Sequence, residues 1–176
     1  MINLHIITLI KNHVPSLGAD CSSPGEIHAA KLAGIQPNEC IYTGNYESYE
    51  DLEFAFKAGV HINLDDISSF HRLRSIGIPK EISFRLNPGF GKGAFSQIVT
   101  GGENSKFGVP HYDIVKAYRL AKDSGIKKFG IQCMTGSGIL DQDYYPHLMK
   151  QILKSVKLLA NELDIQIGRA SCRERV

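Results

Sequence analysis

Short strand-like runs recur at a fixed spacing along the first half of the chain. They begin at Ala19 (ADCSS), Cys40 (CIYTGN), His61 (HINLDD) and Ile82 (ISFRLNP), and successive starts are 21 residues apart. Between them lie stretches with the 3.6-residue period of an amphipathic helix. Short strands that alternate with helical patterns of roughly 10–15 residues predict βαβ units and therefore a parallel sheet.

Each of the three intervening helices has a start signal and a stop signal. The first opens on Pro24, which is favoured in the first turn of a helix. Ser48 is the expected cap of the second helix, and Asp66 or Ser68 starts the third. The stop residues are Gly34, Gly59 and Gly77.

The repeat breaks after residue 88. Residues 89–110 form a long glycine-rich insertion, followed by a helix to about 125, a strand at 127–135, a helix at about 141–162 and the start of a strand at 164–167. Such a short repeat favours a barrel wound like triosephosphate isomerase, which when complete has eight strands and about 250 residues. We therefore predict an α/β fold, a partial (β/α)8 TIM-type barrel with about six of its eight strands. A smaller open sheet is the alternative.

Composition and charge exclude several classes of protein. With 43% hydrophobic and 22% charged residues, the chain is not collagen-like, coiled-coil or disordered. No apolar run approaches the roughly 18–20 residues of a membrane helix, and no signal peptide is recognised, so we expect a cytoplasmic protein without a membrane partner. The net charge of +2 is too small to indicate nucleic acid as a partner.

The last ten residues, 167–176 (IGRASCRERV), differ from the rest of the chain. They carry a net charge of +2, whereas residues 1–166 hold 17 basic and 17 acidic side chains. The segment has no hydrophobic period and resembles the in-frame translation of a widely used sequencing adapter. We therefore predict one domain over residues 1–166 and a non-native, adapter-like tail over residues 167–176. A natural basic tail is the alternative.

The cysteines and histidines show no metal-site spacing. Outside the tail the cysteines are Cys21, Cys40 and Cys133, an odd number that indicates reduced thiols. The seven histidines are scattered, and no Ser-His-Asp or Cys-His arrangement is recognised. We expect no metal ion in this protein.

Polar side chains gather at the C-terminal ends of the predicted strands, where parallel α/β folds place their active sites. They are Asp20, Ser22, Ser23, Thr43, Asn45, Asn63, Asp65, Asp66, Arg85, Asn87, Thr135 and Ser137. Capping of the next helix is the simpler role for several of these serines and aspartates. Arg85 is different, because a charge inside a barrel strand is very costly unless it is paired or faces a ligand. The turn at 135–138 (TGSG) offers backbone N–H groups and a hydroxyl to a phosphate.

Six segments stand in a specific order along the chain. They are GADCSSPGEIHAAKLAGI, YTGN, GVHINLDD, ISFRLNPG, VTGG with SKFG, and MTGS followed by DYY. Together they resemble diaminopimelate decarboxylase, a member of the alanine-racemase-like, fold-type III pyridoxal-phosphate-dependent decarboxylases. The resemblance runs from about residue 3 to residue 166.

The resemblance implies a barrel that holds pyridoxal 5′-phosphate, and it therefore identifies residues 1–166 as an incomplete pyridoxal-phosphate-binding barrel. Asp20 and Arg85 would lie near the cofactor ring, while Ser137 and Gly138 would contact its phosphate. Met134 stands where the family usually has a histidine stacked on the ring; a thioether packs against a ring but supplies no proton.

Other parts of the family's machinery are not recognised in this sequence. The lysine that forms the aldimine with the cofactor is expected upstream of Met1, so no catalytic residue is assigned within the chain. We expect the C-terminal β-domain of the family to be absent from this chain. The family also implies a homodimer with shared active sites.

The implied reaction of the parent protein is the decarboxylation of an amino acid, meso-diaminopimelate to L-lysine and CO2. We expect the segment alone to be inactive. The alternatives are an ornithine or arginine decarboxylase of the same fold, and a non-catalytic α/β module that binds a phosphorylated ligand at the turn 135–138.

Overall fold

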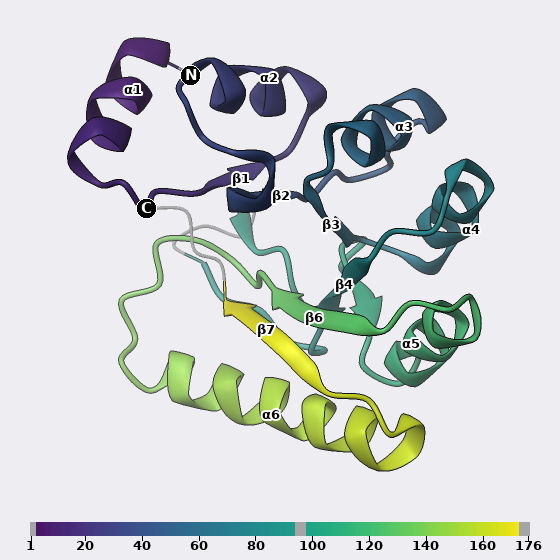
Figure 1. Ribbon diagram of the computed structural model, residues 1–176. Coiled ribbons are helices and arrows are strands. Elements are labelled where there is room, and N and C mark those ends of the chain that lie inside the picture. Colours follow the sequence, from purple (N-terminus) through teal and green to yellow (C-terminus); the bar gives the residue numbers. More distant parts are fainter. Residues whose placement is uncertain (1–2, 94–97, 173–176) are drawn as a thin grey trace.

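The computed structural model describes residues 3–93 and 98–172, which form one curved sheet with helices along its outer side (Figure 1). The strands are β1 (Ala19–Cys21), β2 (Cys40–Tyr42), β3 (His61–Leu64), β4 (Glu81–Asn87), β5 (Val109–Pro110), β6 (Lys128–Cys133) and β7 (Ile167–Cys172). The helices are α1 (Leu4–His13), α2 (Pro24–Leu32), α3 (Tyr49–Ala58), α4 (Ile67–Ile76), α5 (Ile114–Asp123) and α6 (Tyr144–Leu163), and a 3₁₀ turn, η1, covers Pro37–Glu39.

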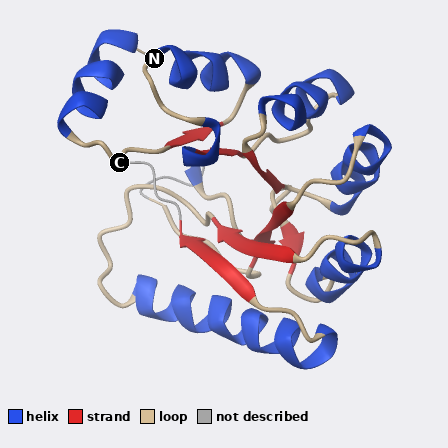
Figure 2. Ribbon diagram, viewed as in Figure 1, coloured by secondary structure: helices blue, strands red, loops and turns tan. Residues whose placement is uncertain are grey.

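All paired strands of the sheet run parallel. Their order is β1-β2-β3-β4-β6-β7, and the short β5 pairs with the C-terminal end of β4. A helix follows β1, β2, β3 and β6 directly, and α5 follows β4 after the short β5. Figure 2 shows these helices as an arc around the strands. Within the described residues β1 and β7 end the sheet without pairing to each other. The predicted partial TIM-type barrel is therefore confirmed, and it is not closed.

Alternation along β4 separates the two faces of the sheet. Phe84 points outward, where its ring lies 5.1 Å from the Tyr118 ring of α5 and 6.0 Å from the Phe70 ring of α4. Ser83 and Arg85 point the other way: Ser83 contacts His61 and Asn63 of β3, and Arg85 binds Asp65, which directly follows β3. Burying apolar rings between sheet and helices stabilises the barrel wall. The inner face is left polar, unlike the Val/Ile/Leu filling that is usual in such barrels.

The helix starts follow the capping signals of the sequence. Ser23, Ser48 and Asp66 are the N-caps of α2, α3 and α4, and each side chain accepts a hydrogen bond from a backbone N–H of the first turn. Asp66 is thus the cap of the third predicted helix rather than Ser68. Each such cap contributes about 0.5–2 kcal/mol to helix stability.

Helix α6 is the longest helix and lies against one end of the sheet (Figure 1). Its buried positions recur every three or four residues, as expected for one helix face. They are Tyr144, Leu148, Ile152, Ser155, Leu159 and Leu163. None of the helices within residues 3–93 and 98–172 is long and apolar enough to cross a membrane.

The start of the last strand differs from the sequence-based expectation. We predicted a strand from residue 164, but Asp164 ends α6 in the left-handed conformation (φ 49°), and β7 begins at Ile167. The strand pairs with β6 although Gly168, Arg169 and Ala170 are exposed. Backbone pairing with an open sheet edge does not require alternating side chains, which explains a strand without a hydrophobic period. The non-native origin of residues 167–176 stays a prediction.

Candidate functional site

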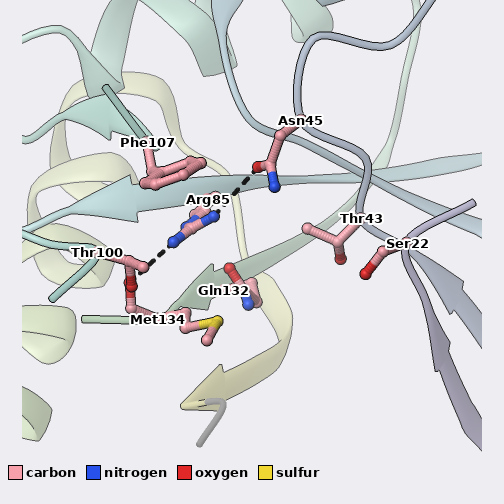
Figure 3. Close-up of a pocket in the computed structure, with 8 residues that line it drawn as sticks. All are labelled: Ser22, Thr43, Asn45, Arg85, Thr100, Phe107, Gln132 and Met134. Carbon is pink, nitrogen blue, oxygen red and sulfur yellow. Dashed lines mark hydrogen bonds between the residues drawn. The ribbon is translucent and has the colours of Figure 1, made fainter. Parts of the chain in front are cut away.

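A cavity of about 160 Å³ lies at the C-terminal ends of the strands. Its wall combines residues that follow β1, β2 and β6, residues within β4 and β6, and two residues of the insertion 89–110. Figure 3 shows the eight lining side chains, which are Ser22, Thr43, Asn45, Arg85, Thr100, Phe107, Gln132 and Met134. The location agrees with the general position of active sites in parallel α/β folds.

Arg85 is the charged group of this wall and is almost completely buried, with 3% of its surface exposed. Its Nη1 donates to Asp65 Oδ1 at 3.0 Å and to Asn45 Oδ1 at 3.3 Å, and its Nη2 donates to the Met134 carbonyl oxygen at 3.1 Å. The Phe107 ring centroid lies 4.9 Å from the guanidinium carbon, a cation–π contact. These partners hold the positive charge in one place.

The partner of Arg85, Asp65, is equally buried. Burial raises the pKa of the Asp65 carboxyl, and the adjacent guanidinium opposes that shift. The pair therefore lies in a low-dielectric environment, where each charge depends on the other. Asp65 directly precedes the N-cap of α4, so the same strand end supplies a cap and the partner of Arg85.

A chain of hydrogen bonds runs along the inner face beneath the cavity. His61 Nδ1 contacts Glu81 Oε1 at 2.9 Å, and His61 Nε2 contacts Ser83 Oγ at 2.8 Å. Ser83 donates to Asn63 Oδ1 at 2.8 Å, and Asn63 Nδ2 donates to Thr43 Oγ1 at 3.4 Å. Burial lowers the pKa of His61. The chain connects the bottom of the sheet to Thr43 in the cavity wall and fixes that hydroxyl.

The insertion 89–110 folds back over the strand ends. Asn87 connects two segments of the insertion. Asn87 Oδ1 accepts from the N–H groups of Gly89 and Gly102 at 3.0 and 3.1 Å, and Asn87 Nδ2 donates to the Gly102 carbonyl. Thr100 Oγ1 donates to the Met134 carbonyl at 2.9 Å. These contacts bring Thr100 and Phe107 into the cavity wall. Residues 94–97 lie outside the described residues.

Glu47 places a second buried carboxyl near this site, with 4% of its surface exposed. The Ser69 hydroxyl donates to its Oε2 at 2.6 Å, while its Oε1 has no hydrogen-bond partner within the part of the chain that is described. Burial raises the pKa of Glu47, and the charges of Asp66 and Asp65 add to the increase. Ionisation of Glu47 therefore opposes folding.

We expect Glu47→Gln to stabilise the folded chain progressively as the pH rises above the ordinary glutamate pKa of about 4.3. Below that pH the carboxyl is protonated in both folded and unfolded chains, so the variant and the wild type have similar stability. Above that pH the carboxyl ionises in the unfolded chain before it ionises in the folded chain, which favours unfolding. Only the wild type loses stability in this way, because glutamine does not ionise. Urea unfolding at several pH values measures the difference. The control is Glu50→Gln, an exposed position in α3; an advantage of Glu47→Gln that shrinks with rising pH would contradict the prediction.

The structure brings together two of the five cofactor-binding residues predicted from the sequence. Arg85 and Met134 both line the cavity. Asp20 lies on β1 beside Ile41 and lines a different cavity with Ala19 and Cys21. Ser137 and Gly138 follow Met134 in the loop after β6 and are not part of the cavity wall. Their contacts with a cofactor stay predictions.

Three lining residues were not recognised as site residues from the sequence. Gln132 lies inside the predicted strand. The alternation of residues along that strand places Gln132 on the inner face but does not distinguish it as a ligand-binding residue. Thr100 and Phe107 belong to the insertion, for which no site residue was predicted from the sequence. Within the described residues no group of three His, Cys, Asp or Glu side chains is placed to hold a metal ion.

Comparison with known proteins identifies the family of the chain. The sequence model of the family described as "Pyridoxal-dependent decarboxylase, pyridoxal binding domain" matches residues 2–168. The chain belongs to this family. The predicted resemblance is thereby confirmed for almost the whole chain, and the match ends near the start of β7.

Curated relatives of this chain include diaminopimelate decarboxylases. That of Methanothermobacter thermautotrophicus is 42% identical over 143 residues, which is 80% of this chain and 33% of the relative. The solved structure of the Helicobacter pylori enzyme complexed with L-lysine has a TM-score of 0.86 at 29% identity and covers 96% of this chain and 43% of that chain. The arginine decarboxylase of Paramecium bursaria Chlorella virus, with a TM-score of 0.81 at 20% identity, shares the fold. The chain therefore spans about a third of the length of its curated relative.

The cavity fits the ring of pyridoxal phosphate, the cofactor that the family implies. A cavity of about 150 Å³ is sufficient for one benzene molecule, and this cavity measures about 160 Å³. The Phe107 ring and the Met134 thioether provide apolar contact, and Ser22, Thr43 and Thr100 provide hydroxyl groups. A polar aromatic ring requires this mixture of apolar and hydrogen-bonding contacts.

Proposed function

We propose that this chain is the pyridoxal-binding part of a diaminopimelate decarboxylase, which converts meso-diaminopimelate to L-lysine and CO2. The 42% identity with a diaminopimelate decarboxylase over 80% of the chain carries the proposal. The ring-sized cavity at the strand ends supports it. Residues 1–166 are the proposed domain, and residues 167–176 the proposed non-native tail.

We further propose that the cofactor ring lies against Arg85 and Met134, with Asp20 nearby and the phosphate near Ser137 and Gly138. When bound, pyridoxal phosphate supplies an electron sink for the negative charge left when CO2 departs. The chain contributes a fixed environment. Arg85 keeps its orientation through Asp65 and supplies a constant positive charge beside the ring.

Around that charge, Phe107 keeps water from the guanidinium, because its ring covers one face of the group. The hydrogen-bond chain that begins at His61 orients Thr43, so the Thr43 hydroxyl has a fixed position for binding a ligand. Preorganised groups of this kind need no rearrangement when a ligand binds.

A homodimer with shared active sites and a cytoplasmic location are also part of the proposal. The family resemblance supports the dimer. The buried free thiols Cys21, Cys40 and Cys133 support a reducing compartment.

The test of the function uses the complete reading frame, obtained by extending the source DNA in both directions. The purified protein with pyridoxal phosphate is expected to release CO2 from meso-diaminopimelate, and to do so at least tenfold faster than from L-ornithine or L-arginine. Faster release from ornithine or arginine would assign the protein to the sister activities of the same fold. A complete protein without decarboxylation of any of the three would contradict the proposal and favour a binding module.

A further inference from the structure

Gln132 is a polar residue of the cavity wall to which the proposed function gives no role. It lies on β6 directly beside Arg85 of β4, and 2% of its surface is exposed. Its Oε1 has no hydrogen-bond partner among residues 3–93 and 98–172. In Figure 3 its amide lies in the wall with Met134 to one side and Thr43 and Ser22 to the other. A buried carbonyl oxygen without a donor is unfavourable in a folded protein.

The neighbouring polar groups of the inner face are satisfied by protein partners. Asn63, an amide of the same face, accepts from Ser83 and donates to Thr43. Arg85 binds Asp65, Asn45 and the Met134 carbonyl. Gln132 is therefore not one more member of the structural network. Gln132 nevertheless lines the cavity, which has room for one six-membered ring.

We infer that Gln132 is a ligand-binding residue whose amide oxygen accepts a hydrogen bond from an N–H or O–H donor on the polar aromatic ring that fills the cavity. This inference rests on the proposed function in taking that ring to be the pyridine ring of pyridoxal phosphate. Gln132 and Arg85 are neighbours in the sheet, so together they present an acceptor and a positive charge to one edge of the ring. Binding of the ring then gives the amide oxygen a hydrogen-bond donor, which removes the free-energy cost of leaving it unpaired in the ligand-free protein.

The first arm of the test is the stability of the ligand-free chain 1–176. Gln132→Met conserves length and removes the unpaired amide, and we expect it to raise the melting temperature by about 2–8 °C. The matched control is Asn63→Leu, which removes a partnered amide from the same face and is expected to lower the melting temperature. An unchanged or lower melting temperature for Gln132→Met would show that the amide has a structural partner and would overturn the inference.

The second arm is cofactor affinity in a chimera. Residues 3–166 replace the matching segment of the Methanothermobacter diaminopimelate decarboxylase, so that the host supplies the rest of the protein. Titration with pyridoxal phosphate gives its dissociation constant, and the melting measurements are repeated in this protein. We expect Gln132→Met to weaken binding about 3–10-fold, which is the contribution of one hydrogen bond. Gln132→Glu retains the acceptor and is expected to retain most of the affinity.

The two arms separate failure of the inference from failure of the proposed function. A chimera that binds pyridoxal phosphate equally well with Gln132→Met overturns the inference, even if the melting temperature rises. A chimera of unaltered sequence that does not bind pyridoxal phosphate contradicts the proposed function and also removes the assigned ligand of Gln132. Rescue by Gln132→Glu together with loss in Gln132→Met supports an acceptor role that a packing residue would not show.

Discussion

Asp65→Asn is expected to destabilise the folded chain by about 3–5 kcal/mol, because it leaves the guanidinium of Arg85 buried without its carboxylate. Arg85 Nη1 lies 3.0 Å from Asp65 Oδ1, and both side chains are almost completely buried. Urea unfolding of the chain 1–176, followed by circular dichroism, measures the loss as a lower midpoint. This is the largest stability effect that the structure predicts for a single substitution in the site.

The double variant Asp65→Leu with Arg85→Met is expected to recover most of that stability. Replacing both members of a buried ion pair by apolar side chains of similar volume removes both desolvation costs. Asp66→Asn is the matched control, since asparagine caps helices about as well as aspartate, so α4 keeps its cap. A loss for Asp65→Asn no larger than that of Asp66→Asn would show that Arg85 has another sufficient partner.

Residues 1–176 alone are expected to give no stoichiometric lysine adduct with pyridoxal phosphate. None of the eight side chains that line the cavity is a lysine. Lys11, near the start of the chain, is held elsewhere: its Nζ donates to the Glu39 carboxylate at 2.8 Å and to two backbone carbonyls. Neutral hydrogen bonds to the cofactor contribute about 0.5–1.5 kcal/mol each. That falls short of the roughly 4–15 kcal/mol needed to immobilise a ligand.

Incubation with pyridoxal phosphate, borohydride reduction and peptide mapping measure the adduct. The chimera described above is the positive control, in which one host lysine is expected to react. Lys106 is the residue of this chain whose labelling would contradict the prediction, because its Nζ lies 5.1 Å from the centre of the Phe107 ring at the cavity wall. One equivalent of label on Lys106 at micromolar cofactor, lost in Lys106→Arg, would show that this chain contains its own reactive lysine.

Much of the architecture could be predicted from the sequence because it is encoded locally. The repeat of 21 residues, the caps Ser48 and Asp66, and the glycines Gly59 and Gly77 that end α3 and α4 specify βαβ units whatever lies around them. The positions at the C-terminal ends of the strands followed from the same pattern, and Ser22, Thr43, Asn45 and Arg85 do line one cavity. Six short segments in order were also sufficient to indicate the family, which the match over residues 2–168 confirms.

The end of the chain shows where local pattern fails. Residues 169–172 have no strand signal, yet they pair with β6, because an open sheet edge offers hydrogen-bonding groups to any adjacent backbone. The same applies to β5, a two-residue strand within the insertion that pairs with the end of β4. Neither pairing depends on side-chain alternation, so the hydrophobic pattern carries no trace of it.

By itself, the sequence determined the fold class, the family and the candidate role of Arg85, because periodicity, caps and the cost of an unpaired buried charge are properties of short segments. The tertiary structure alone decided which polar groups share one cavity. It paired Arg85 with Asp65 and placed the Phe107 ring over the guanidinium. It also left the amide oxygen of Gln132 without a hydrogen-bond partner among the described residues. The hydrogen bonds of Arg85 join residues 20 to 49 positions apart, and their geometry depends on sheet register and on the path of the insertion. A hydrogen bond is formed or lost within a few tenths of an ångström, which only the assembled fold defines.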